Sequence, residues 1–178
     1  MRSPTNDVSN ISRIIAQGMG MDKDAIDGLR IGAILHDLGL MFIPTEILHK
    51  PGKLTPAEYE TVKQHPVHAF QMLRTIDFPW PVARMVLQHQ ERLDGSGYPG
   101  GIKGDDIVME ARIIAVADVI ESMTSDRHWR KALTIEVALD EIKASRGIKY
   151  DSSVVDACVD IYTNRPEILD NSKYPRGK

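Results

Sequence analysis

Cysteine is nearly absent from the 178-residue sequence, since Cys158 is the only one. An intrachain disulfide is therefore excluded, and this usage is typical of a protein from a reducing compartment. The sequence also lacks any run close to the roughly 20 apolar residues that a membrane-spanning helix requires, and residues 1–4 do not begin a secretory signal. We expect a cytoplasmic protein with no membrane partner.

An excess of charge of one sign is also missing. Lys and Arg number 22 and Asp and Glu number 25, giving a net charge of −3, so no overall field attracts a long nucleic acid. The length is sufficient for one domain with its own core, which we expect to cover residues 1–165, followed by a polar tail at residues 166–178. The first expected helix begins close to Met1, which leaves open that the chain is one module of a longer protein.

Long alternating runs of β-branched residues, which would indicate a sheet, are absent as well. Apolar residues instead recur at helical spacing, as in Ile26, Ala33 and Ile34. Thr55 can cap a helix, and Glu58 is placed to complete a capping box with it. We predict an all-α, single-domain helical bundle, with a short turn at residues 46–48 and helices near residues 8–18, 26–38, 55–64, 66–73, 82–89, 111–122, 134–145 and 152–162.

Asp118 is a carboxylate on the apolar stripe of a predicted helix, in line with Ile114 and Ala115. A buried carboxylate is costly to ionise unless a metal, an arginine or hydrogen-bond donors meet it. A helix cap or a buried ion pair is the alternative interpretation. Asp118 therefore indicates a polar partner inside the bundle, and a metal ion is one such partner.

Three histidines end or interrupt inward-facing stripes in the same way. His36 is followed directly by Asp37, His65 lies at the junction of two predicted helices, and His89 falls one turn after Met85. A single histidine at such a place is more often a hydrogen-bonded core residue. Together with Asp118 these residues predict a shared cation, and their nitrogen and oxygen ligands suit iron, manganese, zinc or nickel.

The segment after His89 predicts a loop that approaches a ligand closely. Four glycines lie within residues 95–101, and Pro99 follows Tyr98, so an aromatic ring is held on a stiff turn. Tyr98 can stack on a nucleobase; the alternative is an ordinary surface loop with a packed tyrosine. Downstream, Arg127, Arg130 and Lys131 form a cluster that suits phosphate oxygens, or else a solvated basic turn.

In this order the motifs resemble the HD-GYP family, a branch of the HD metal-dependent phosphohydrolases whose known activity is the hydrolysis of cyclic di-GMP. The resemblance covers nearly the whole chain and implies the HD-superfamily fold. It rests on His36-Asp37-Leu38-Gly39, Ile43-Pro44, Ile47-Leu48, Lys50-Pro51-Gly52-Lys53-Leu54-Thr55, His65-Pro66, His89-Gln90-Glu91-Arg92, Asp94-Gly95-Ser96-Gly97-Tyr98-Pro99, Ala117-Asp118, Ser125-Asp126-Arg127 and Arg130-Lys131-Ala132.

The resemblance also implies roles for individual residues. Adjacent iron or manganese ions, of which the family has two and sometimes three, would activate a bridging water and neutralise charge on the phosphodiester. The implied metal ligands are His36, Asp37, His65, His89 and Asp118, of which His36, Asp37 and Asp118 would also be catalytic. The implied substrate-binding residues are Gly97, Tyr98, Pro99, Glu121, Arg127 and Arg130, with Glu121 where the family usually has an aspartate and the two arginines on phosphate.

Three positions depart from the family pattern. Asn10 and Gln90 stand where members usually have histidines, and Leu40 stands where they usually have a lysine. The first hypothesis is therefore a cyclic di-GMP phosphodiesterase with a reduced metal complement. A degenerate module that binds cyclic di-GMP or a signalling partner without turnover is the second, and an HD phosphohydrolase acting on another nucleotide is the third. A sensory or receiver domain in a longer protein is a further expected partner.

Overall fold

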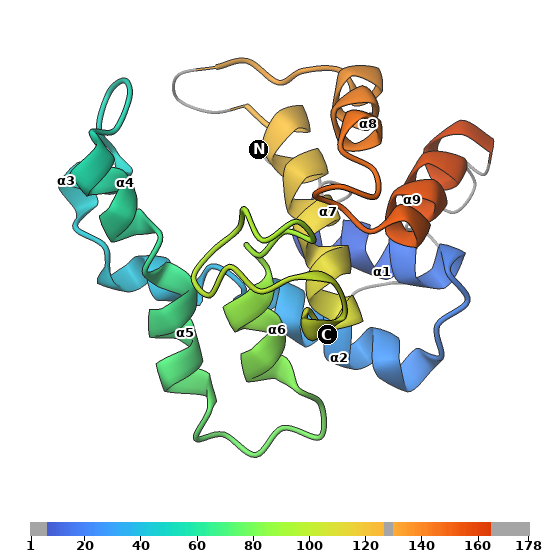
Figure 1. The fold of residues 1–178 in the computed structure, drawn as a ribbon, viewed down its shortest axis with the longest axis horizontal. Helices are drawn as coiled ribbons and strands as arrows, with labels where there is room; N and C mark the ends of the chain where they lie inside the picture. The colour runs from blue at the N-terminus through green and yellow to red at the C-terminus, as the bar shows by residue number, and fades with distance from the viewer. Residues whose placement is uncertain (1–6, 127–129, 165–178) are drawn as a thin grey trace, which may run out of the picture.

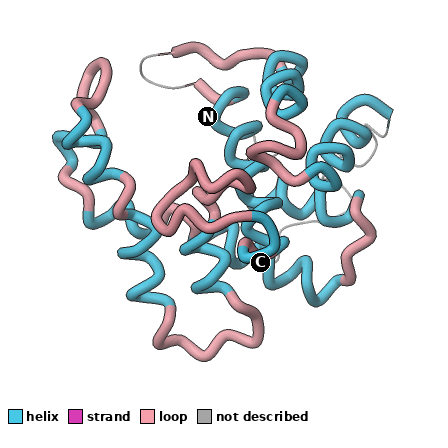
Figure 2. The backbone as a smooth tube through the Cα atoms, in the orientation of Figure 1, coloured by secondary structure: helices cyan, strands magenta, loops and turns pink. Residues whose placement is uncertain are grey.

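The computed structural model describes residues 7–126 and 130–164. Its described part is all-helical, as predicted, and has no strand, only an isolated bridge between Arg146 and Tyr150 (Figures 1 and 2). The α-helices are α1 (Val8–Gly18), α2 (Lys23–Leu35), α3 (Thr45–Leu48), α4 (Pro56–Val62), α5 (His65–Leu73), α6 (Val82–Gln88), α7 (Met109–Thr124), α8 (Ile135–Ala144) and α9 (Ser152–Asn164). Two short 3-10 helices complete the described chain, η1 (Leu38–Phe42) and η2 (Gly104–Asp106).

The main core forms around α7, which packs against α1, α2, α8 and α9. Ile113, Ile114 and Ile120 of α7 are almost fully buried there, and so is Cys158 of α9. Burying one such isoleucine side chain contributes about 1.5–3 kcal/mol. Because this core surrounds α7, the middle of α7 is a rigid platform for the side chains that it presents, Asp118 among them.

A smaller core joins α5 and α6 to α2. It consists of the buried residues Ala69, Leu73, Val82 and Val86, with partly buried neighbours from α2 and from the segment before α6. Since α5 begins at His65 and α6 ends just before His89, this second core determines where those two histidines lie. Figure 1 shows α5 and α6 side by side, with α3 and α4 beyond α5 at the edge of the molecule.

The local predictions hold at the start of α4 and fail at two places in and after α2. The Glu58 amide donates to the Thr55 hydroxyl at 3.3 Å and the Thr55 amide donates to the Glu58 carboxylate at 2.7 Å, which is the predicted capping box. Ile34, predicted to face inward, is 65% exposed because it lies about 100° around the helix from the buried Ala33. The helix predicted to continue to residue 38 ends at Leu35 and is followed by η1.

Candidate metal centre

The five predicted ligands come together from four separate parts of the chain, and we call this set the candidate centre. His36 caps the end of α2, Asp37 precedes η1, His65 opens α5, His89 caps the end of α6, and Asp118 lies within α7. Four of them are at helix ends, where a side chain can turn toward a neighbouring helix. Helix packing thus brings five residues, from His36 to Asp118 along the chain, into one cluster.

The donor atoms of the candidate centre lie within a few ångströms of one another. The Nε2 atoms of His65 and His89 are 3.3 Å apart, and His65 Nε2 is 3.6 Å from Asp37 Oδ1. His36 Nε2 is 3.3 Å from Asp37 Oδ2 and 3.9 Å from Asp118 Oδ1. Asp37, His65 and His89 each offer one ligand atom, and these three atoms all lie within 4.8 Å of one another. The three residues are therefore a possible metal-binding group.

All three histidine rings have the same orientation. Each Nδ1 contacts a backbone carbonyl three residues earlier, at 2.7 Å for His36, 2.8 Å for His65 and 2.7 Å for His89. A carbonyl oxygen only accepts hydrogen bonds, so Nδ1 carries the proton and donates it. In its neutral form each ring therefore points the Nε2 lone pair into the candidate centre, the arrangement in which metal-ligating histidines are usually held.

This orientation leaves the His65–His89 contact without a proton to share. Both Nε2 atoms are acceptors in the neutral rings, yet they face each other at 3.3 Å in a site where His89 is fully buried. Two facing lone pairs repel unless a cation lies beside both. Nitrogen ligands about 2.1 Å from a shared ion and at right angles to each other are about 3 Å apart. The residues present thus fit a metal ion.

The negative charges of Asp37 and Asp118 act to raise the pKa of the histidine rings near them. Burial lowers the pKa of His36, but the hydrogen bond and charge of Asp37, with the charge of Asp118, raise it to about 9. Burial lowers the pKa of His65, and it is the largest of the effects that bring the pKa of His89 to about 3. Asp37 has a pKa below its usual value because His36 outweighs the effect of burial. The candidate centre therefore attracts positive charge while keeping two imidazoles neutral.

Asp118 is the most buried carboxylate of the candidate centre. Burial raises its pKa above the usual value, against the opposing effect of His36. One of its oxygens faces His36, and the other accepts a hydrogen bond from the Gln90 side chain at 3.2 Å. Among the described residues Asp118 contacts Gln90 and His36, and it forms neither a helix cap nor an arginine pair, so its surroundings favour the cation interpretation.

Gly39 explains how the His36-Asp37 pair reaches His65. A Cβ atom at Gly39 would overlap the carbonyl of His65, and it would lie 2.9 Å from the amide nitrogen of Ala69. The absence of a side chain lets η1 lie directly on the first turn of α5. This backbone contact holds Asp37 beside His65.

The glycine-rich loop lies on the end of α6, next to the candidate centre. The Tyr98 amide donates to the carbonyl of Gln90 at 3.2 Å, and the Gly100 amide donates to the buried Glu91 carboxylate at 2.6 Å. A Cβ at Gly97 would overlap the backbone of Glu91, so glycine is required for this approach. The bond from Tyr98 to Pro99 is cis, and the Tyr98 ring lies 6.2 Å from the ring of His65.

The three departures from the family pattern have defined surroundings. The side-chain oxygen of Asn10 accepts from the Arg13 guanidinium at 2.7 and 3.2 Å. The side-chain oxygen of Gln90 accepts from Arg92 at 3.4 Å, while its amide donates to Asp118. Both amide oxygens thus face a guanidinium, which disfavours a second cation at the same atom. Leu40 is half-buried and brings no charge.

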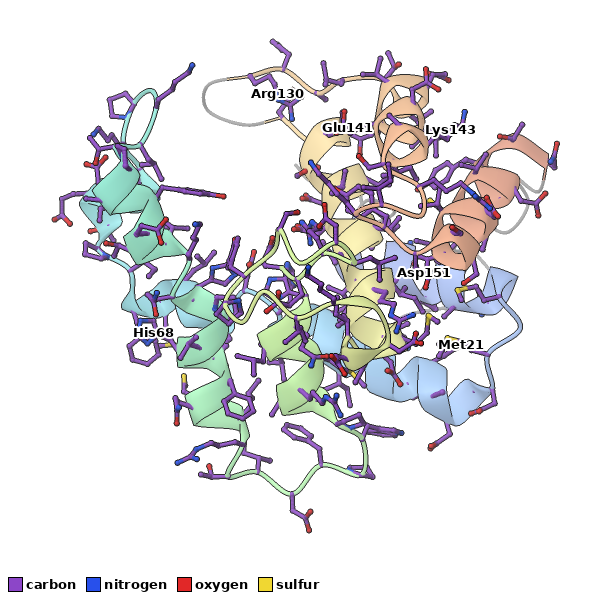
Figure 3. The ribbon with its side chains drawn as sticks, in the orientation of Figure 1. Met21, His68, Arg130, Glu141, Lys143 and Asp151 are labelled. Carbon is purple, nitrogen blue, oxygen red and sulfur yellow. The ribbon has the colours of Figure 1, made fainter. Side chains whose placement is uncertain are left out.

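Two of the remaining predicted substrate residues, Glu121 and Arg130, lie around the end of α7. Glu121 is buried and accepts from the Ser125 hydroxyl at 2.9 Å. Arg130 donates to the carbonyls of Ser122 and Met123 at 2.6 and 3.1 Å, so it caps α7 (Figure 3). Arg127 lies outside the described residues. Their predicted contacts with substrate stay predictions. Sequence reasoning overlooked the buried Glu91, although this residue lies within a motif that it had singled out.

Comparison with known proteins adds an independent finding. A model of the HD domain family matches residues 1–154. The chain is 39% identical over 152 residues to the cyclic di-GMP phosphodiesterase response regulator RpfG of Xanthomonas campestris, covering 84% of this chain and 40% of that protein. It is 40% identical over 155 residues to a cyclic di-GMP phosphodiesterase of Thermotoga maritima, covering 86% of this chain and 42% of that protein. The chain thus spans less than half the length of both relatives.

One further relative and one solved structure also match the chain. The 3′3′-cGAMP-specific phosphodiesterase 1 of Vibrio cholerae is 33% identical over 156 residues, covering 85% of this chain and 36% of that protein. Among solved structures, Bd1817, an HDG"Y"P protein from Bdellovibrio bacteriovorus, superposes with a TM-score of 0.70 at 22% identity, covering 90% of this chain and 51% of that chain. That identity is low enough that the superposition supports the fold alone.

Proposed function

The chain belongs to the HD domain family, as the resemblance to its HD-GYP branch predicted, and on that premise we propose that it is a metal-dependent phosphodiesterase that hydrolyses cyclic di-GMP. The observation that carries the proposal is the 3.3 Å approach of His65 Nε2 and His89 Nε2, because both lone pairs face the same position. Relatives named as cyclic di-GMP phosphodiesterases support the substrate.

The candidate centre would hold iron or manganese, two ions in the active enzyme. Bound divalent ions supply a water activated for attack and offset the negative charge that develops on the phosphodiester. The protein contributes the orientation of the donors. The carbonyls behind His36, His65 and His89 hold Nε2 toward the ion, and the carboxylates of Asp37 and Asp118 balance its charge. In this proposal His36, Asp37 and Asp118 are also the catalytic residues.

The substrate would lie between the candidate centre and the glycine-rich loop. Tyr98 offers an aromatic face next to His65, on which a guanine base can stack. Gly97 and Pro99 keep that ring in place, Glu121 would border the site, and Arg127 and Arg130 would contact phosphate. Because one relative is named as specific for 3′3′-cGAMP, the second base is the feature of the substrate that an assay must compare.

A degenerate, binding-only module is the second candidate function. The observation that favours it is that the amide oxygens of Asn10 and Gln90 accept hydrogen bonds from Arg13 and Arg92. Oxygens that already face a guanidinium are disfavoured as ligands of a second metal ion. In that case the chain would bind cyclic di-GMP or a signalling partner without turnover. Under either function, the short span relative to the curated relatives supports a neighbouring sensory or receiver domain.

The proposal extends to the boundaries and location of the domain. We take residues 1–165 as the phosphohydrolase domain and residues 166–178 as a tail. A cytoplasmic location is supported by Cys158, a free cysteine that is buried in α9. Among the described residues, no helix has the length and apolar character needed to cross a membrane.

The decisive experiment measures metal content and turnover together. The purified chain, loaded with Mn(II) or Fe(II) under reducing conditions, is incubated with cyclic di-GMP and separately with 3′3′-cGAMP, and the products are resolved by chromatography. Linear dinucleotide or GMP formed only with metal supports the enzyme. Tight binding of cyclic di-GMP without products supports the binding-only module, and the absence of bound metal contradicts the candidate centre.

Gln90→His is expected to raise metal content and turnover together. An imidazole in place of the amide adds a stronger ligand for these ions and removes the hydrogen bond that Gln90 donates to Asp118. We expect roughly one additional ion per chain, measured by inductively coupled plasma mass spectrometry, and a several-fold higher rate. Gln88→His is the control, because Gln88 binds the backbone of Asp106 and Val108 instead. A rise in neither quantity for Gln90→His would show that residue 90 does not limit the site.

A further inference from the structure

We propose that Lys63 binds a phosphate group of the substrate beside the candidate centre, with Tyr59 and Tyr98 forming the walls around its ammonium group. This inference rests on the proposed function and adds a substrate-binding residue to it. Lys63 directly follows α4 and lies two positions before His65. A short turn therefore connects a cation to a predicted metal ligand.

The ammonium group of Lys63 is held between two aromatic rings. Its Nζ lies 5.1 Å from the centroid of the Tyr59 ring and 5.8 Å from that of Tyr98. The Tyr98 ring is in turn 6.2 Å from the His65 ring. Only 27% of the Lys63 side chain is exposed, although lysine is a residue that usually extends into solvent. The rings attract the cation and hold it near the candidate centre.

The present partner of Lys63 is one that a ligand can replace. Its ammonium group contacts the Glu60 carboxylate at 2.7 Å, and the Glu60 side chain is 63% exposed. An ion pair with an exposed carboxylate of this kind contributes little to stability, because solvent screens it. A substrate phosphate arriving beside Tyr98 can therefore take the place of Glu60, which returns to solvent.

Two other described cations, Arg92 and Arg130, already donate hydrogen bonds within the protein. Arg92 donates to the carbonyls of His89 and Glu91 and to the Gln90 side chain. Arg130 donates to three backbone carbonyls around the end of α7. Releasing either guanidinium would leave buried or half-buried acceptors without their donors, which is costly. Arg130 can therefore meet a phosphate only through the N–H groups that these backbone bonds do not use.

The charge of the proposed substrate requires such a cation. A cyclic dinucleotide carries two phosphodiesters, and only the one that is cleaved can lie at the metal ions. The second phosphodiester remains negative and must be met by the protein. Lys63 is placed for this role because its ammonium group lies beside the Tyr98 ring, which is proposed to stack on a base. The other neighbour of the Tyr98 ring is His65, a predicted metal ligand.

The test compares three variants of the full chain loaded with Mn(II). Lys63→Met is expected to raise the Kd for cyclic di-GMP about tenfold, equivalent to about 1.4 kcal/mol, without changing the metal content. Lys63→Arg keeps the charge and is expected to stay within about threefold of the wild type. Lys143→Met is the matched control, because Lys143 forms the same i,i+3 pair, with Asp140 on α8, far from α4 (Figures 1 and 3).

The outcomes separate this inference from the proposed function. If the wild type binds cyclic di-GMP and Lys63→Met binds it within twofold, the role of Lys63 is refuted while the proposed function stands. If Lys63→Met loses metal as well as ligand, Lys63 is a structural residue and the inference is also wrong. A wild type that binds neither cyclic di-GMP nor 3′3′-cGAMP would refute both proposals.

Discussion

Replacing His89 with glutamine is expected to remove most bound metal and to lower the rate of cyclic di-GMP hydrolysis by about a thousandfold or more. His89 is fully buried, and its Nε2 faces that of His65 at 3.3 Å. Glutamine offers an amide in place of the imidazole lone pair, so the ion loses a strong ligand. The loss of several kcal/mol of charge stabilisation by the metal corresponds to a rate effect of this size. Metal content and initial rates measure it.

His68→Gln is the control for this substitution. His68 lies on α5, one turn after His65, and its ring contacts Phe42 at 5.5 Å between centroids (Figure 3). It has no part in the candidate centre, so metal content and rate should stay within about twofold of the wild type. If His89→Gln retained full metal content, the two facing Nε2 atoms would not be ligands, and the metal interpretation would fail.

Gly39→Ala is expected to have the second-largest effect, because it acts on the fold and on the candidate centre together. The added Cβ would overlap the His65 carbonyl, so η1 must move away from α5. Forcing an extra methyl group into such a contact costs about 1–3 kcal/mol. The same displacement would move Asp37 Oδ1 away from His65 Nε2, which is 3.6 Å from it in the wild type. The metal affinity should therefore fall together with the stability. Urea unfolding of the metal-free chain and metal titration measure the two effects separately.

Met41→Ala is the matched control on the same 3-10 helix. Met41 is 67% exposed, so its substitution should change the free energy of unfolding by less than about 0.5 kcal/mol. Full stability of Gly39→Ala would mean that η1 does not need its close approach to α5. A loss of stability with unchanged metal affinity would mean that this approach does not position Asp37.

Much of the fold could be predicted from local patterns. The capping box at Thr55 and the apolar stripe of α7 each depend on residues within one or two turns, and local hydrogen bonds and helix period decide their form. The prediction failed where the chain leaves α2. Ile34 looked like a core residue because it is apolar, yet its place around the helix turns it to solvent. The 3-10 helix η1 is stabilised by its contact with α5, which no local pattern reveals.

The membership of the candidate centre was predictable, whereas its electrostatics were not. Histidine or aspartate on an apolar stripe already indicates a polar partner inside the bundle. The proton on each Nδ1, and hence the inward lone pair on each Nε2, depends on carbonyls whose positions follow from the three-dimensional path of the backbone. The contacts of Gln90 with Asp118 and Arg92 are likewise products of packing.

By itself, the amino-acid sequence determined the all-helical class, the approximate helix ends, and which polar residues lie on apolar stripes, because hydrophobic period and helix capping operate between near neighbours. Only the tertiary structure decided that His65 and His89 face each other, that Gly39 holds Asp37 beside them, and that Lys63 lies between Tyr59 and Tyr98. Those contacts join residues from different helices, so their distances follow from how the two cores pack.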